Sequence, residues 1–210
     1  MKALKDWADL FKRKRDGGLS RNEAIGLWGE LSILLELSKA LDGAELELMR
    51  GWRGPHGDQR DVGLNGVRVE IKTQLATSAK SLQISSLDQL DDRGDRLFIA
   101  LNRISPSQSG SSLRELIATC HAHLSTKMSA CSEFDRKIEL SGYVEDSQIS
   151  NEKFELDERT LFRAHKGFPR LTSNNVDVGI TAAAYTIAGA RLDDFCAPWD
   201  TLIEAIHGKS

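Results

Sequence analysis

The chain has 210 residues, of which 40% are hydrophobic and 28% charged, with a formal net charge of -3. These values are ordinary for a globular protein and exclude a general electrostatic attraction to nucleic acid or anionic lipid, so any such contact needs a local basic surface. The spacing of Cys120, Cys131 and Cys196 predicts neither a disulfide framework nor a zinc site. Without a signal peptide or an apolar run of membrane-spanning length, we expect a cytoplasmic protein that does not bind membranes.

The first 60 residues predict two helices, a short strand and a loop. Residues 1–15 have the pattern of a small amphipathic helix, which places an N-terminal extension at 1–18. Ser20 and Glu23 form a capping-box pattern that begins a helix of about five turns. ELELM (45–49) is compatible with a short strand, and 51–60 is rich in turn-forming residues.

The remainder of the chain alternates between helix and strand patterns. The expected elements after the 61–73 segment are a short helix at 81–92, a buried strand at 96–104, a polar loop at 105–112, a helix at 113–124, a strand at 137–146, strand-like residues at 178–192 and a closing helix from Pro198. This order predicts an α/β or α+β protein with a mixed sheet. We expect one domain over 1–210, completed by the strands and helix of about 147–210.

The segment DVGLNGVRVEIKT (61–73) predicts a β-hairpin with two acids at its open end. Asn65-Gly66 between alternating runs is a strong signal for a two-residue type I′ turn. This turn sets Asp61 directly opposite Glu70, with Cβ atoms roughly 4.5 to 5.5 Å apart. Lys72 points to the same side as Glu70, because side chains alternate along a strand.

Two acids placed opposite each other repel, so a cation is expected between them. Mg²⁺ (or Mn²⁺) bound by Asp61 and Glu70, with Lys72 beside it, is an arrangement suited to phosphodiester hydrolysis. Lys72 would orient or deprotonate the attacking water, or neutralise charge on the phosphate oxygens. The same spacing is also typical of a half-solvated strand, so spacing alone leaves both interpretations open.

Several sequence blocks occur in an order that resembles a known family. The blocks are GLWGELSILLEL (26–37), WxGP (52–55), DV (61–62), VEIKT (69–73), ISSLDQL (84–90), FPRL (168–171) and YTI (185–187). This pattern resembles the bacterial family of PD-(D/E)XK motif proteins, within the restriction-endonuclease-like nuclease superfamily. The resemblance implies a mixed central sheet flanked by helices, with Asp61 as metal ligand, Glu70 as second acid and Lys72 as catalytic lysine. Arg60 stands where the family motif has proline.

The resemblance also implies a third metal ligand, Glu30, on the first long helix. Glu30 lies at the edge of that helix's apolar stripe, where a carboxylate needs a partner, although it could also reach water. Gly26 and Gly29 would allow a backbone or ligand to approach this face. We consider Gln74 and His56 as accessory residues, with a strand-end role for Gln74 and an exposed loop for His56 as the alternatives.

A short basic segment is the candidate for nucleic-acid contact, through Arg163, Lys166 and Arg170 beside His165. Such residues are also commonly just solvated. His121 and His123 are expected to diverge on their helix and not to form a metal-binding pair.

The function predicted from these observations is a metal-dependent nuclease that acts on DNA. The resemblance implies a restriction or anti-phage setting, and the net charge of -3 favours a second copy of the chain or a partner protein to help hold the substrate. The main alternative is a catalytically silent nucleic-acid-binding or scaffolding subunit. A retaining glycosidase would fit the spacing of the acids, but it lacks an aromatic sugar platform and leaves Lys72 without a role.

Overall fold

The computed structural model describes residues 18–54, 61–92 and 94–208. The helix predicted at 1–15, Arg60 and His56 lie outside these ranges. The chain clusters into two compact units, a helical unit within Met1–Asp58 and Pro106–Glu155 and a sheet unit comprising Gln59–Ser105 and Leu156–Ser210. The single domain expected from the sequence stays a prediction. Among the described residues, no helix has both the length and the apolar character needed to cross a membrane.

The helical unit contains the predicted long helices. Its elements are α2 (Arg21–Ala40), α3 (Glu45–Gly51), α4 (Leu113–Leu124), α5 (Met128–Leu140) and the 3₁₀ turn η1 (Gln148–Asn151). The capping box at the start of α2 is formed, because the Ser20 side chain accepts from the Glu23 backbone N–H and Glu23 accepts from the Ser20 backbone N–H. A second capping box, between Ser112 and Glu115, begins α4.

Two strand predictions in this unit are wrong. Residues 45–49 belong to α3, where Glu45, Leu48 and Met49 are buried at helical spacing. Residues 137–140 end α5, and the chain then turns. Buried Lys137 donates from Nζ to the backbone carbonyls of Met49 and Arg50, at 2.5 and 3.1 Å, so it holds the C-terminal end of α3.

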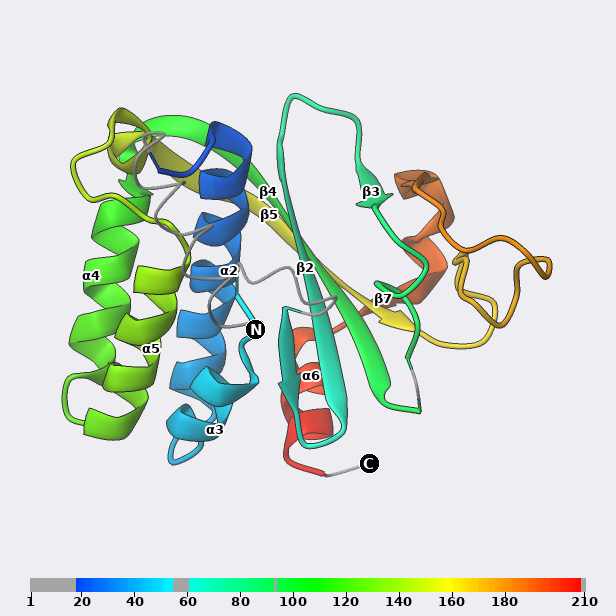
Figure 1. Ribbon diagram of the computed structural model, residues 1–210, viewed down its shortest axis with the longest axis horizontal. Coiled ribbons are helices and arrows are strands. Elements are labelled where there is room, and N and C mark those ends of the chain that lie inside the picture. The colour runs from blue at the N-terminus through cyan, green and yellow to red at the C-terminus, as the bar shows by residue number, and fades with distance from the viewer. Residues whose placement is uncertain (1–17, 55–60, 93, 209–210) are drawn as a thin grey trace. The chain divides into compact units, whose positions relative to one another are not determined.

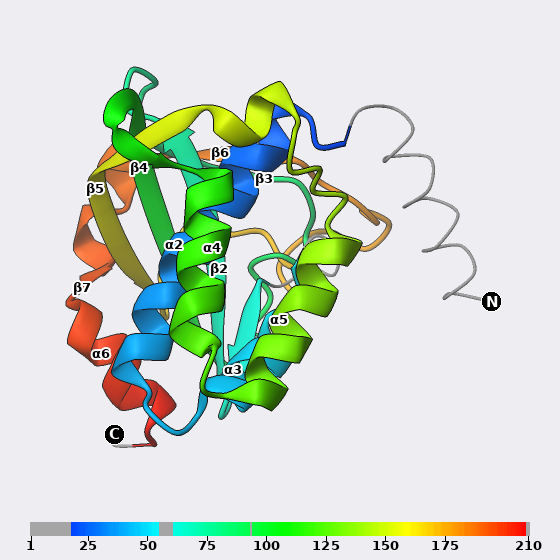
Figure 2. The ribbon, with the colours of Figure 1, turned by 90° about the vertical axis from the view of Figure 1, so that its left-hand side faces the viewer.

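Two tryptophan side chains, Trp28 and Trp52, pack within the helical unit. Helix α4 packs against both α2 and α5 (Figure 2). Trp28 of α2 donates its indole N–H to the Ser111 carbonyl at 2.9 Å and meets Phe154 edge-on. Trp52, which is fully buried, stacks on Phe134 of α5. Each indole is thus buried and also makes a specific contact, which is a hydrogen bond from its N–H group or packing against another aromatic ring.

The sheet unit is organised around strands β1, β2, β4, β5 and β7 of a mixed five-stranded sheet (Figure 1). The strands are β1 (Val62–Leu64), β2 (Val67–Leu75), β3 (Ser81–Ile84), β4 (Arg96–Ser112), β5 (Lys153–Ala164), β6 (Tyr185–Ala188) and β7 (Cys196–Ala197). The β1–β2 and β5–β7 pairs are antiparallel, β2 and β4 are parallel, and β3 and β6 form a separate antiparallel pair. The 3₁₀ turns η2 (Gly189–Arg191) and η3 (Asp193–Phe195) precede β7. Two of the three chain boundaries between the units fall within β4 and β5.

The predictions for these segments have mixed outcomes. The buried strand at 96–104 is confirmed, and the closing helix α6 (Trp199–Ile206) has Pro198 at its N-cap, as predicted. The helix predicted at 81–92 is wrong, because 81–84 form β3. The loop predicted at 105–112 is also wrong, because β4 continues to Ser112. Within 178–192 only Tyr185–Ala188 is strand.

Helix α6 holds the turn end of the β1–β2 hairpin. Its carbonyls at Ala205 and Ile206 accept from the Arg96 guanidinium at 2.6 Å and from the Asn65 amide at 3.0 Å. Residues 97–101 of β4 are all apolar and buried, as expected for a parallel strand that is covered on both faces. The predicted fold class, an α/β restriction-endonuclease-like mixed sheet with flanking helices, is confirmed.

Candidate active site

The β1–β2 hairpin has the turn and register that its sequence predicts. Asn65 and Gly66 take φ angles of 51° and 71°, as a type I′ turn requires. The paired residues are Val62 with Val69, Gly63 with Arg68, and Leu64 with Val67. One further step along this register sets Asp61 opposite Glu70.

The open end of the hairpin brings Asp61, Glu70 and Lys72 together. The Oδ2 atom of Asp61 accepts a hydrogen bond from the Ile71 backbone N–H at 2.5 Å. Glu70 is only 3% exposed, and its Oε1 lies 2.8 Å from the Lys72 Nζ. The predicted juxtaposition is therefore present, while the catalytic and metal-binding roles of these residues stay predictions.

Burial perturbs both carboxyl groups of the hairpin. It raises the pKa of Asp61 to about 6, although the Ile71 N–H and the Lys72 ammonium act in the opposite direction. Burial, followed by the Asp61 charge, raises the pKa of Glu70 to about 8 against the effect of Lys72. Lys72 and Arg68 offset the charges of these two acids only in part, and a divalent cation would favour the ionised form of both.

The interpretation of β2 as a half-solvated strand is wrong. Arg68 is 2% exposed, so the side of β2 that carries Arg68 and Glu70 is as buried as the side that carries Val67 and Val69. Arg68 donates to the backbone carbonyl of Asp91 and also acts to lower the pKa of Glu70. A carboxylate in this environment depends on protein cations, since water is scarce.

Lys72 lines a cleft of about 650 Å³ in the sheet unit. Most of the other lining residues are polar and come from β2, the connection to β3, and the β3–β6 pair: Thr73, Gln74, Ser78, Ala79, Ser81, Gln83, Ile84, Ser85, Leu101, Ala184, Tyr185 and Thr186. The cleft has the size of a small-molecule or nucleotide site. Its hydroxyl and amide groups can hydrogen-bond a polar, charged substrate beside the Lys72 ammonium.

The sequence contained a signal for the β3 wall of this cleft that the helix prediction for 81–92 missed. Ser81, Gln83 and Ser85 alternate with Leu82 and Ile84, and the two apolar residues are buried. Strict alternation over five residues is the period of a strand with one solvated face. The β6 wall lies within the strand-like residues predicted at 178–192, but its pairing with β3 had no local signal, because the paired residues are about a hundred positions apart.

Gln74 lies on the same strand as Lys72 and lines the cleft. Its amide donates to the Ala79 carbonyl at 3.1 Å and accepts from the Ser81 N–H at 3.4 Å. Gln74 therefore holds the connection between β2 and β3, and an accessory contact to substrate stays a prediction.

The predicted basic cluster is divided in the structure. Arg170 lies 2.6 Å from the Asp92 carboxylate and donates to the Leu90 carbonyl, so its guanidinium organises the protein itself. Arg163 and Lys166 are exposed at and after the end of β5. These two remain candidates for a nucleic-acid contact.

Glu30 has a described partner in the helical unit. Its Oε2 accepts from the Trp52 indole N–H at 2.7 Å, which answers the expectation that a carboxylate at the edge of the stripe needs a partner. A metal-binding role for Glu30 stays a prediction. A Cβ added at Gly26 would meet no atom within 4 Å, so no close approach explains that glycine.

Comparison with known proteins supports one assignment. The model of the family described as "Putative PD-(D/E)XK family member, (DUF4420)" matches residues 1–189. No curated protein matches the chain, and no solved structure does. The family match covers most of the sequence, including every residue of the hairpin and the cleft. This chain therefore belongs to that PD-(D/E)XK family.

Proposed function

We propose that this protein is a metal-dependent nuclease that hydrolyses phosphodiester bonds in DNA. The observation that carries the proposal is the convergence of Asp61, Glu70 and Lys72 on one hairpin, with Lys72 lining a polar cleft. Membership of a PD-(D/E)XK family supports a nuclease class.

The donor set fits a hard divalent cation such as Mg²⁺ (or Mn²⁺). Asp61 and Glu70 offer carboxylate oxygens, which such cations prefer, and Glu30 is proposed as a further ligand. Burial raises the pKa of both hairpin acids, as expected where a cation completes the charge balance. When bound, the metal would polarise the phosphate and lower the pKa of a coordinated water.

The protein groups have separate tasks in this scheme. The Ile71 N–H fixes the orientation of the Asp61 carboxylate, so that this ligand is positioned before substrate arrives. Lys72 forms an ion pair with Glu70, in which Nζ lies 2.8 Å from Oε1. Once a cation balances the Glu70 charge, the Lys72 ammonium becomes available to orient the attacking water or to neutralise charge on the phosphate oxygens.

The substrate side of the proposal follows from the cleft and the charge. Hydroxyl and amide groups lining the cleft suit phosphate and sugar contacts, which position a nucleic acid without reading its sequence. The net charge of -3 gives weak overall attraction, so we propose that exposed Arg163 and Lys166 act together with a second copy or a partner protein. A role in restriction or anti-phage defence rests on the family resemblance alone.

Cleavage assays with the intact protein test this proposal. Labelled DNA and RNA, each single- and double-stranded, are incubated with Mg²⁺, Mn²⁺ or EDTA, using the wild type, Lys72→Ala and Lys153→Ala. Lys153 is a matched control, since it is an ion-paired lysine of the helical unit. We expect metal-dependent cleavage that Lys72→Ala lowers by about 10²- to 10⁴-fold and Lys153→Ala leaves unchanged.

The outcomes separate the alternatives. Cleavage of RNA but not DNA would contradict the substrate class. Binding of DNA without cleavage of any nucleic acid under either metal would contradict the nuclease proposal and favour a catalytically silent binding subunit. Equal activity of the wild type and Lys72→Ala would remove the assigned role of Lys72.

A further inference from the structure

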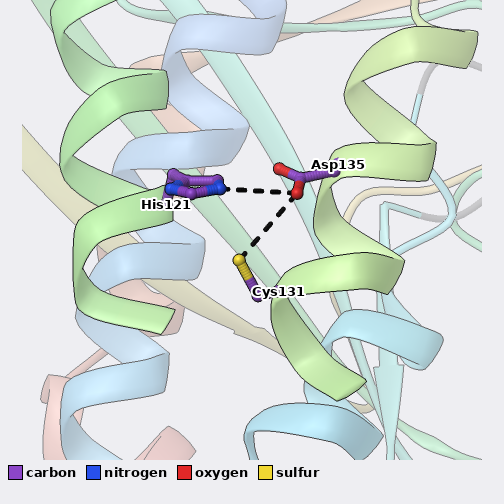
Figure 3. A group of neighbouring side chains, drawn as sticks. All are labelled: His121, Cys131 and Asp135. Atoms are coloured by element: carbon purple, nitrogen blue, oxygen red, sulfur yellow. Dashed lines mark hydrogen bonds and ion pairs between the residues drawn. The ribbon is translucent and has the colours of Figure 1, made fainter. Parts of the chain in front are cut away.

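Three potential metal ligands from two helices converge on the surface of the helical unit. His121 comes from α4, while Cys131 and Asp135 lie one turn apart on α5 (Figure 3). The His121 Nε2 lies 3.4 Å from Asp135 Oδ2, and Cys131 Sγ lies 3.9 Å from the same oxygen. All three ligand atoms are within 4.8 Å of one another.

These distances are close to those of a tetrahedral metal site. Zinc bonds of about 2.0 to 2.3 Å at tetrahedral angles put neighbouring nitrogen and oxygen ligands about 3.4 Å apart and neighbouring sulfur and oxygen ligands about 3.6 Å apart. The His121–Asp135 distance already agrees, and the Cys131–Asp135 distance exceeds its target by a few tenths of an ångström. The third pair, His121 and Cys131, lies within 4.8 Å, so the set closes on a metal ion when the side chains rotate toward one another.

We propose that His121, Cys131 and Asp135 bind a borderline transition-metal ion, with Zn²⁺ as the expected occupant. An imidazole, a thiolate and a carboxylate are the ligands that Zn²⁺ takes, whereas Mg²⁺ and Ca²⁺ prefer oxygen alone. The His121 and Asp135 side chains are each 52% exposed, so the fourth position faces water. The ion would add a bond between α4 and α5, which already pack together and follow each other in the chain through the short segment 125–127.

The order of contacts argues against a nucleophilic cysteine at this place. Asp135 lies between the thiol and the imidazole and contacts both (Figure 3). A catalytic thiol needs a histidine beside it and a lowered pKa. Here burial and the Asp135 charge raise the pKa of Cys131. A bound cation would reverse this effect, because it stabilises the thiolate and the carboxylate together.

The site was missed at the sequence level because its ligands belong to separate helices. The irregular cysteine spacing predicted no zinc site, and His121 and His123 were expected to diverge. They do diverge, since His123 contacts Ser38 of α2 at 3.1 Å while His121 faces α5. The remaining signal was Cys131 and Asp135 at i and i+4, which share a helix face.

Titration of the full-length, metal-free protein with Co²⁺ tests the site, because a thiolate ligand gives a cobalt charge-transfer absorption that carboxylate sites lack. We expect this band in the wild type and also in Cys196→Ser, which removes an exposed thiol that is not part of the proposed site. We expect the band to be absent in Cys131→Ser. In His121→Asn and Asp135→Asn, the apparent affinity for Co²⁺ should be at least tenfold weaker. An Asp61→Asn variant should keep the band, which separates this site from the nuclease site.

Thermal unfolding with Zn²⁺ provides a second readout that does not depend on nuclease activity. A Zn²⁺ concentration about 100-fold above Kd should raise the Tm of the wild type by about 5 °C or more, and should not raise that of Cys131→Ser. Equal Tm values of the metal-free proteins would show that the variants fold. Absence of the cobalt band in the wild type, its persistence in Cys131→Ser, or its loss in Cys196→Ser would each overturn the proposal.

Discussion

Replacing Glu70 by glutamine is expected to remove a pH-dependent loss of stability from the metal-free protein. Glu70 is buried beside Asp61, and its pKa rises from an ordinary value of 4.5 to about 8. Between these two values the unfolded chain has released a proton that the folded protein retains. The free energy of unfolding therefore falls as pH rises through this interval and levels off above pH 8.

The size of this effect follows from the same shift. One group contributes a slope of at most about 1.4 kcal/mol per pH unit, so wild type and Glu70→Gln should diverge by up to about 4 kcal/mol between pH 5 and pH 8. Glutamine stays neutral, has nearly the same shape and can still accept a hydrogen bond from Lys72. The variant should consequently gain stability relative to the wild type as pH rises, even though it lacks a proposed metal ligand.

Urea unfolding at pH 5, 6, 7 and 8 in EDTA measures this difference, with midpoints and m-values compared at each pH. Glu155→Gln, which changes an exposed carboxylate, is the matched control and should run parallel to the wild type. Mg²⁺ should stabilise the wild type and not Glu70→Gln, so the stability difference between the two proteins at pH 8 should be smaller in Mg²⁺ than in EDTA. Parallel curves for wild type and Glu70→Gln in EDTA would refute the reasoning, since they would show that Glu70 titrates like a solvated acid.

Two further predictions concern Trp52 and Gly110, which both belong to the helical unit. Trp52→Phe removes the indole donor to Glu30 and should lower the free energy of unfolding by about 2 to 4 kcal/mol, because a hydrogen bond to a charged group and buried volume are both lost. Urea titrations measure this change, and an effect below about 0.5 kcal/mol would show that the hydrogen bond contributes little. Gly110→Ala would place a Cβ against the Phe154 carbonyl oxygen, much closer than van der Waals contact allows, and should cost about 1 to 3 kcal/mol or more. Gly63→Ala would meet no atom within 4 Å and should cost less than about 1 kcal/mol. Equal thermal shifts for the two alanine variants would contradict the close approach of the strands.

The sequence alone determined the elements whose signals are local. The Ser20–Glu23 capping box began α2 where predicted, and Pro198 stands before α6. The Asn65-Gly66 turn set the hairpin register without any information from the rest of the fold, because a two-residue loop allows one pairing. The register in turn brought Asp61 to Glu70, so the centre of the candidate site was predictable from thirteen residues.

Tertiary structure decided the segments whose patterns suit more than one state. ELELM is compatible with strand alternation, and its burial at helical spacing became visible only once α3 had packed against α5. The serine-rich segment 105–112 lacks strand propensity and is extended because β5 pairs beside it. Propensity over a few residues is worth too little to resist such pairing and burial.

The perturbed acids, the cleft and the proposed second metal site also depended on tertiary structure. Arg68 and Glu70 have the alternation of a solvated strand face, and only the covering of that face made their charges costly and raised the Glu70 pKa. The cleft needs β6 beside β3, and the second metal site needs α4 beside α5. Chemistry that joins residues distant in the chain has no local signature, because the contacts that create it exist only after folding.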